Sequence, residues 1–307
     1  MTTSTRTALL VCGFTVAGAL FAFQRPFREF NGMEYNIGAT LENYWGINVG
    51  GNLMKAQWDP VALRGGPALH VDPGASWYAN LNTDPRKPVW FSLNASTQRT
   101  PASDLSSAEV DLGATIQARS NIDIYVGPMF ATRQDPMQYV DQVPDQAGKL
   151  HYIFGAIRQT TTSMTLRMNW TFSPHLTLQA YAQPFIASGR YDELKDVDNP
   201  HAETFADRFH VLQGREYAIA NGTVSVARNG DSYSFTQPDF DIRQLRSTVV
   251  LRWEYRPGST VFAIWSHGAT SETDFDGRFN LGHDLRELAH APAENIIAVK
   301  ANYWFGF

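Results

Sequence analysis

Ala301-Asn302-Tyr303-Trp304-Phe305-Gly306-Phe307 ends the chain, and the alternation to which it belongs reaches back to Ile297. Every second position from Ile297 onward is apolar or aromatic, while residues such as Lys300 and Asn302 fill the gaps. Because a strand places alternate side chains on opposite faces, one face is apolar and the other mostly polar. A strand that ends on Phe is typical of the closing strand of an outer-membrane β-barrel, and the aromatics Tyr303, Phe305 and Phe307 would then sit in its interfacial girdle. Taken alone, this stretch also fits the last strand of a soluble β-sandwich.

Composition narrows the class of protein. Hydrophobic residues make up 43% of the 307 residues and charged residues 18%, below the roughly 25% that is usual in soluble domains. The mean hydropathy of −0.29 excludes a bundle of membrane helices, whereas a transmembrane barrel fits because half of each strand faces water. The net charge of −5 and the scattered basic residues predict no nucleic-acid partner. Cys12 is the single cysteine, which excludes an internal disulfide framework.

The N-terminus allows two interpretations. Arg6 precedes an apolar stretch from Ala8 to Val16, and Ala17-Gly18-Ala19 offers a small-residue cleavage site. This layout is typical of a secretory signal peptide over residues 1–19. Alternatively, residues 1–19 are the remnant of an upstream strand and Leu20 to Phe23 belongs to a first strand. In either case residues 20–307 are expected to form the barrel.

Alternation with a period of two recurs along the chain, as half-buried strands require. One face of each segment carries charged or amide side chains and the other carries none. The clearest segments span residues 34–42, 89–96, 109–117, 164–172 and 248–255. The sequence therefore predicts an all-β fold.

The connections between these segments fall into two lengths. Short turns rich in Pro and Gly lie near residues 45–46, 84–88, 119–121, 173–175 and 256–259. Long polar connections alternate with them, at residues 58–74, 98–107, 133–148, 187–241 and 268–293. Short periplasmic turns opposite long extracellular loops are the pattern of outer-membrane barrels, and a sandwich has no reason to sort its loops this way. We therefore predict a transmembrane, antiparallel, up-and-down barrel of about 12 strands, with one helix outside it over His283 to Ala291, ending at Pro292.

Several motifs resemble an uncharacterised bacterial family, a domain of unknown function. Among them are Leu63-Arg64-Gly65-Gly66-Pro67-Ala68-Leu69, Tyr181-Ala182-Gln183-Pro184-Phe185, Ser188-Gly189-Arg190-Tyr191 and Leu251-Arg252-Trp253-Glu254-Tyr255-Arg256-Pro257-Gly258-Ser259. The resemblance covers roughly Phe30 to Phe307. Members usually join a module similar to carbohydrate-binding family 9 to a C-terminal outer-membrane barrel, so the resemblance implies the barrel. The module and the strands that normally precede this region are missing here, which leaves open a short relative or a piece of a larger barrel.

Charged residues on the polar faces are the candidate lining of the barrel. Because a charge facing lipid near the midplane costs about 2–4 kcal/mol, these residues are expected to face the lumen. They are Glu34, Glu42, Glu109, Asp111, Asp123, Arg167, Arg252, Glu254 and Lys300. They line a solute pore in one interpretation. In the other they pair across strands in a plugged lumen, with Arg252 and Glu254 meeting Lys300.

The loop expected over residues 187–241 is the second candidate region. It is rich in acidic residues and histidines, namely Asp192, Glu193, Asp196, Asp198, His201, Glu203, Asp207 and His210. Their oxygens could hold calcium, but the spacing matches no known binding loop. We therefore expect a solvated acidic loop and no metal site. Its aromatics indicate that it packs on itself or on the barrel mouth, where aromatic side chains can also stack on sugar rings.

A hydrolase site at the barrel rim is a third hypothesis. Ser266, His267 and His151 lie near strand ends, but no motif pairs a nucleophile with a base. Neighbours such as Ser266 and His267 point to opposite faces of a strand and so do not pair readily. No catalytic residue and no cofactor is therefore predicted.

The functional expectation is an outer-membrane barrel of a Gram-negative-type envelope. The leading hypothesis is a passive channel or uptake barrel for small, carbohydrate-derived solutes. The alternative is an occluded barrel that binds or anchors at the cell surface, with its carbohydrate-binding-like module encoded upstream. Expected partners are outer-membrane lipid, the barrel assembly machinery through the C-terminal strand, and a small solute or carbohydrate.

Overall fold

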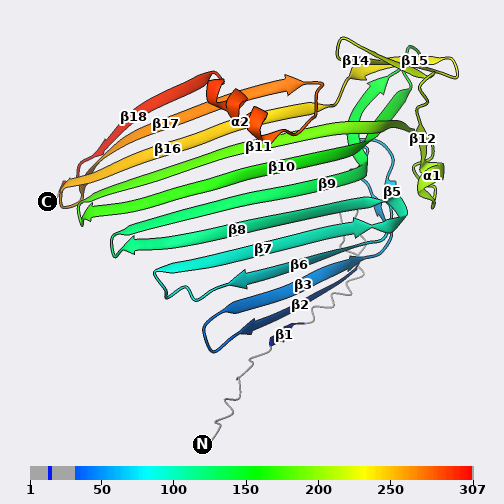
Figure 1. The fold of residues 1–307 in the computed structure, drawn as a ribbon. Helices are drawn as coiled ribbons and strands as arrows, with labels where there is room; N and C mark the ends of the chain where they lie inside the picture. Colours follow the sequence, from blue (N-terminus) through cyan, green and yellow to red (C-terminus); the bar gives the residue numbers. More distant parts are fainter. Residues whose placement is uncertain (1–12, 16–31, 306–307) are drawn as a thin grey trace, which may run out of the picture.

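The computed structural model describes residues 13–15 and 32–305. Most of these residues form one broad, curved sheet, with β1 at one edge and β18 at the other (Figure 1). Every neighbouring pair of strands in it is antiparallel. In spatial order the strands are β1 (Gly13–Thr15), β2 (Gly32–Thr40), β3 (Gly46–Met54), β6 (Gly74–Asn82), β7 (Val89–Thr100), β8 (Leu105–Arg119), β9 (Ile122–Pro144), β10 (Leu150–Ser173), β11 (Leu176–Val197), β16 (Phe240–Arg256), β17 (Ser259–Asp274) and β18 (Ala293–Asn302).

This order confirms the predicted all-β, up-and-down architecture of about 12 strands. Each strand pairs with the next strand of the sheet along the chain, and the inserted elements leave that order unchanged. Within the described residues β18 pairs with β17 and not with β1 or β2, so closure of the sheet into a cylinder stays a prediction. The signal-peptide interpretation and Leu20 to Phe23 fall on residues that, apart from Gly13–Thr15, lie outside the described part of the chain.

The strand register separates the two faces of the sheet. Asn48, Asn80, Asn94 and Asp111 lie opposite one another in one row across β3, β6, β7 and β8. The neighbouring row on the other face holds Leu81, Leu93 and Leu112. The period-two pattern of the sequence has therefore become one polar face and one apolar face.

The apolar face is exposed over most of the sheet. Phe91, Phe130 and Trp253 keep 53%, 49% and 53% of their surface accessible, although they lie in the interiors of strands. Soluble proteins rarely expose contiguous apolar patches of more than a few hundred Å². An aromatic and aliphatic face of this extent is the surface that a bilayer would cover.

Three of the predicted long connections are wrong, because their strands continue further than the alternation indicated. The connection expected over residues 133–148 is a tight hairpin, since β9 runs to Pro144 and β10 begins at Leu150. Likewise, β7 runs to Thr100 and β8 begins at Leu105, so the connection expected over residues 98–107 shrinks to the short 3-10 helix η1 (Pro101–Ser103) and Asp104. β11 covers the first eleven residues of the loop expected over 187–241. In these extensions both faces carry polar residues, so the period-two signal ends before the strand does.

Inserted elements pack on the ends of β9, β10 and β11 at the long-loop end of the sheet (Figure 1). We call residues 55–73, 137–155 and 193–239 the loop-side cap. It contains the hairpin β4 (Gln57–Asp59) and β5 (Leu69–Val71), helix α1 (Phe205–Arg208), β12 (Phe209–Val211), and a small sheet of β13 (Tyr217–Ala220), β14 (Thr223–Arg228) and β15 (Asp231–Thr236).

Two apolar clusters hold the loop-side cap together. The first joins Ile153 and Leu194 on the strand extensions to Val224, Val226 and Phe235 of the small sheet. The second joins Leu63, Leu69, Phe154 and Phe209. Of the two arrangements predicted for the aromatics of residues 187–241, packing of the loop on itself is present for Phe235, which packs with Val224 and Val226. Phe209 packs on Leu63, Leu69 and Phe154.

The predicted helix is present as α2 (Leu281–His290), close to its expected bounds. Asn280 caps it, because its Oδ1 accepts the N–H of His283 at 3.1 Å. Leu288 is buried, whereas Leu285 keeps 45% of its surface exposed, so the two leucines do not share the packed face. α2 lies over β16 and β17 (Figure 1). Among the described residues, no helix is long and apolar enough to cross a membrane.

Candidate functional site: the polar face and the loop-side cap

The register brings most of the predicted lining residues onto one face of the sheet. Glu109 and Asp111 on β8 share that face with Asp123, which lies opposite Gln117. Continuing across the sheet, the same face carries Arg167, Arg252 and Lys300. Glu34 belongs to the equivalent row at the other edge, opposite Asn52. That this face borders a lumen stays a prediction.

Glu42 is the predicted lining residue that does not lie on the sheet. β2 ends at Thr40 and β3 begins at Gly46, so Glu42 lies in the turn between them, with its side chain exposed. The turn is tight because the N–H of Tyr44 donates to the carbonyl of Leu41 at 2.8 Å. The alternation seen in the sequence runs two residues past the end of the strand.

Arg252 and Glu254 pair with each other rather than with Lys300. Arg252 Nη2 donates to Glu254 Oε2 at 3.1 Å. Lys300 lies in the same row as Arg252, but β17 separates β16 from β18, and Phe262 stands between the two basic residues. Two strand spacings amount to roughly 10 Å, so the predicted cross-strand pairing is wrong.

The predicted closing-strand aromatics lie just beyond the last strand. β18 ends at Asn302, and Tyr303 and Phe305 follow it with 50% and 70% of their surface exposed. Arg256 Nη1 donates to the hydroxyl of Tyr303 at 2.6 Å, which ties this end to the turn between β16 and β17. Phe307 lies outside the described residues.

An amide network, which the sequence pattern indicated only as alternating polar positions, occupies the polar face near β2. Asn36 Nδ2 donates to Asn48 Oδ1 at 3.0 Å and to the Tyr78 hydroxyl at 2.6 Å. Asn80 Nδ2 reaches the same Asn48 oxygen at 3.3 Å. These uncharged groups give this part of the face neutral donors and acceptors, of the kind that bind hydroxylated solutes.

The residues proposed for a rim hydrolase are not brought together. Ser266 lies opposite Thr248, with their hydroxyl oxygens 3.4 Å apart, on the polar face. His267 points to the other face, where its Nδ1 lies 3.0 Å from Asn295 Oδ1. His151 belongs to the loop-side cap, so neither histidine is paired with Ser266.

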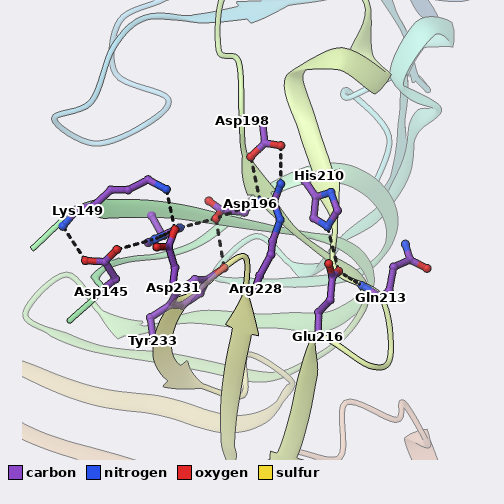
Figure 2. A network of polar contacts seen from close by, with 11 residues as sticks. Asp145, Lys149, Asp196, Asp198, His210, Gln213, Glu216, Arg228, Asp231 and Tyr233 are labelled. Atoms are coloured by element: carbon purple, nitrogen blue, oxygen red, sulfur yellow. Dashed lines mark hydrogen bonds and ion pairs between the residues drawn. The ribbon is translucent and has the colours of Figure 1, made fainter. Parts of the chain in front are cut away.

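The loop-side cap assembles a polar network that no sequence motif indicated (Figure 2). His151 is at its centre with 4% of its surface exposed. Its Nδ1 lies 2.5 Å from Asp196 Oδ2, and its ring stacks on Tyr233 with the centroids 4.2 Å apart. The Tyr233 hydroxyl also donates to Asp196 Oδ2, at 3.2 Å. Burial, together with nearby Asp196, holds the pKa of Tyr233 above its usual range, so this hydroxyl stays a donor.

Two further carboxylates, Asp145 and Asp231, approach the other side of His151. Asp145 follows β9, and its Oδ1 accepts the N–H groups of Ala147 and Lys149 at 2.8 and 2.9 Å. Burial acts to raise the pKa of Asp145, but these two hydrogen bonds and His151 outweigh it and keep the carboxyl pKa below its usual range. Asp231 Oδ2 accepts from Lys149 Nζ at 2.9 Å, and that bond raises the pKa of the lysine.

The acidic residues of the expected loop therefore do not form a uniformly solvated surface. Asp196 is buried at 3% exposure in the His151 network. Asp198 forms a bidentate pair with Arg228, at 3.0 and 2.8 Å, and His210 Nε2 lies 2.9 Å from Glu216. The sequence prediction was wrong for Asp196, because its partners come from strands that are distant along the chain.

Asp145, His151 and Asp231 together form a group that could hold a metal ion. The prediction of no metal site rested on the spacing of acidic residues along the chain. That spacing does not indicate this group, because its members are brought together by the fold. The three residues come from the two sides of the β9–β10 hairpin and from β15.

Comparison with known proteins identifies the family. Residues 22–307 match the model described as Domain of unknown function (DUF5916), and the chain therefore belongs to that family. No curated protein matches the chain.

Among the solved structures that match the chain are two outer-membrane proteins. The copper transporter OprC aligns at 9% identity with a TM-score of 0.45, covering 96% of this chain and 41% of the transporter chain. The TodX monoaromatic hydrocarbon channel, as a deltaS2 mutant, aligns at 10% identity with a TM-score of 0.31, covering 90% of this chain and 73% of that one. This chain thus spans about two fifths of the length of the copper transporter.

Proposed function

We propose that this DUF5916 protein is an outer-membrane β-barrel whose polar face lines a passage for small solutes. The observation that carries the proposal is the separation of the two faces where the strands alternate, most clearly from β3 to β8. Exposed Phe, Trp, Leu and Val side chains cover one face, and rows of Asn, Asp, Arg and Lys follow the other. Lipid suits the first face, and only water or solute suits the second.

The edge at β18, which pairs only with β17 among the described residues, supports closure of the sheet. All ten residues of β18 are exposed, including Ile297 at 79% and Val299 at 72%. An apolar edge strand with unpaired backbone groups is a template for pairing with another strand, and in lipid each unpaired group costs several kcal/mol. We infer that β18 meets a further strand in the membrane, either at the β1–β2 edge or from additional strands of a larger barrel. The same edge is the surface that we expect the barrel assembly machinery to engage.

Carbohydrate-derived compounds are the solute class that we favour. The amide network around Asn48 offers uncharged donors and acceptors, and the family resemblance adds the usual association with a carbohydrate-binding family 9-like module. The finer assignment rests on that resemblance and on the chemistry of amides with hydroxyl groups.

Conductance in planar bilayers tests the proposal. The purified full chain should require detergent, insert into the bilayer and show discrete openings. Sugar uptake in a liposome-swelling assay should then depend on sugar size. A chain that inserts and resists heat as a folded barrel yet stays electrically silent would refute the channel.

An occluded anchoring barrel is the second candidate, and one observation favours it. The loop-side cap is a packed body with its own apolar clusters rather than a set of open loops. A silent barrel that opens after removal of residues 199–238 would indicate that the cap closes it.

A further inference from the structure

Two buried ring nitrogens in the described part of the loop-side cap have no hydrogen-bond partner, His70 Nδ1 and His151 Nε2, and the second faces two carboxylates. His151 Nε2 is enclosed, yet neither carboxylate that faces it is close enough to accept a hydrogen bond. Asp145 Oδ2 lies 3.6 Å away and Asp231 Oδ2 lies 3.8 Å away. A buried polar atom without a partner costs about 1–3 kcal/mol, so three polar groups arranged around a common gap call for an occupant.

The hydrogen bonding of His151 leaves Nε2 without a proton, so that its lone pair is free to bind a ligand. Asp196 is a carboxylate that accepts hydrogen bonds and lies 2.5 Å from Nδ1, so the ring proton belongs on Nδ1. A carboxylate behind the imidazole is the usual arrangement for a histidine that ligates a metal through its other nitrogen. Asp145 is similarly oriented, because the backbone of the hairpin occupies its Oδ1 and leaves Oδ2 facing the gap.

Charge around the gap also favours a cation. Asp145, Asp196 and Asp231 face His151 from three elements, and Asp198 lies beyond Asp196. Opposing these four carboxylates are the side chains of Lys149 and Arg228. Four negative and two positive groups leave a local charge of about −2, which a divalent cation would neutralise.

We propose that Asp145, His151 and Asp231 form a binding site for a divalent transition-metal ion, with Zn²⁺ the best match. Ligand atoms at 2.0–2.2 Å from tetrahedral zinc are roughly 3.4 Å apart. His151 Nε2 lies 3.6 and 3.8 Å from the two carboxylate oxygens, and all three atoms lie within 4.8 Å of one another, so a small contraction would complete the site. One imidazole and two carboxylates suit Zn²⁺ better than Ca²⁺ or Mg²⁺, which prefer all-oxygen sites. Water would complete the coordination from the side where Asp231 is 33% exposed.

Lys149 competes with the ion for Asp231. Its Nζ lies 2.9 Å from Asp231 Oδ2, and its side chain is 64% exposed. When the metal binds, this ammonium moves into solvent, where its long side chain has room. The site would then join the β9–β10 hairpin to β15, fixing the small sheet of the loop-side cap to the strands that carry it.

The test uses the full chain, folded in detergent and stripped with a chelator, titrated with Zn²⁺ against a chromophoric chelator. We expect one ion per chain. Asp231→Asn, a substitution of equal size at a partly exposed position, should weaken binding at least about tenfold, as should His151→Gln. Glu203→Gln removes an exposed carboxylate elsewhere in the cap and should leave the affinity unchanged. Lys149→Met should tighten binding several-fold, because it removes the competing charge.

The Lys149→Met variant separates a metal site from an internal salt-bridge network. In a network without metal, the substitution only removes an ion pair and has no effect on Zn²⁺ affinity. Absence of saturable binding, or equal affinity of Asp231→Asn and Glu203→Gln, would overturn the proposal. The titration requires no conduction, so its outcome is independent of the channel.

Discussion

The buried ion pair between Asp284 of α2 and Arg243 of β16 is expected to hold the helix on the sheet, and substitution of Asp284 tests this. Asp284 is fully buried and accepts from Arg243 Nε at 3.0 Å and from the N–H of Asn280 at 2.8 Å. Arg243, itself 2% exposed, also donates to Asp241 and to Thr273 Oγ1. Leu288 is the other buried side chain of the helix. Since a helix of this length is marginal by itself, much of its stability depends on Asp284.

Asp284→Asn keeps the side-chain volume and removes the charge. Hydrogen bonds to charged groups contribute about 1.5–3 kcal/mol each. The remaining partner, Asp241, still neutralises Arg243, so the loss should stay near 2–3 kcal/mol rather than reach the cost of stranding a buried charge. By the relation of 1.4 kcal/mol per tenfold, local opening of α2 should become about 30- to 150-fold more frequent.

Hydrogen exchange read by mass spectrometry measures this opening directly, because amides in a locally stable segment exchange through local unfolding. Peptides over residues 281–291 should exchange faster by the stated factor, and peptides from β9 and β10 should not change. Glu287→Gln is the matched control, since it removes the same charge from an exposed position of the same helix. If α2 exchanges equally in the two variants, the buried pair does not hold the helix.

Three further predictions concern the sheet and the cap. Gly51→Ala should lower the yield of folded protein, because a Cβ there would lie 2.4 Å from the carbonyl oxygen of Ser76, whereas Gly46→Ala meets nothing within 4 Å and should fold normally. Leu112→Arg should reduce refolding into lipid vesicles at a cost of about 2–4 kcal/mol, while Asp111→Arg, one residue away on the opposite face, should refold; equal defects would contradict the assignment of faces. The pKa of Asp198 lies below its usual range because Arg228 donates hydrogen bonds to it. That contribution to stability is complete above the unfolded pKa of about 4 and is lost as the pH falls through the lower folded value. Protease cleavage of the cap should therefore increase only below about pH 4, and Asp198→Asn should remove the step.

Local pattern predicted the sheet well where each strand has one apolar and one polar face. The segments around Leu112 and Leu251 alternate cleanly. In the structure each forms a strand that pairs with the strand before it in the sheet, as expected. Prediction failed at the loop side, where β9 and β11 continue with polar residues on both faces. Apolar and polar residues alternate along a strand only when its two faces meet different environments. Where both faces meet similar surroundings, the alternation disappears.

The amino-acid sequence alone determined the antiparallel sheet, its two faces and the helix before Pro292, because each depends on neighbours within a few residues. The tertiary structure decided which distant residues meet. Asp145 and His151 come from the β9–β10 hairpin, whereas Asp196 comes from β11 and Asp231 from β15, and no spacing rule relates these three parts of the chain. Their proximity follows from the bulged extensions of β9, β10 and β11 and from the small sheet that packs against them. Long-range packing of this kind sets distances between side chains that local periodicity cannot encode.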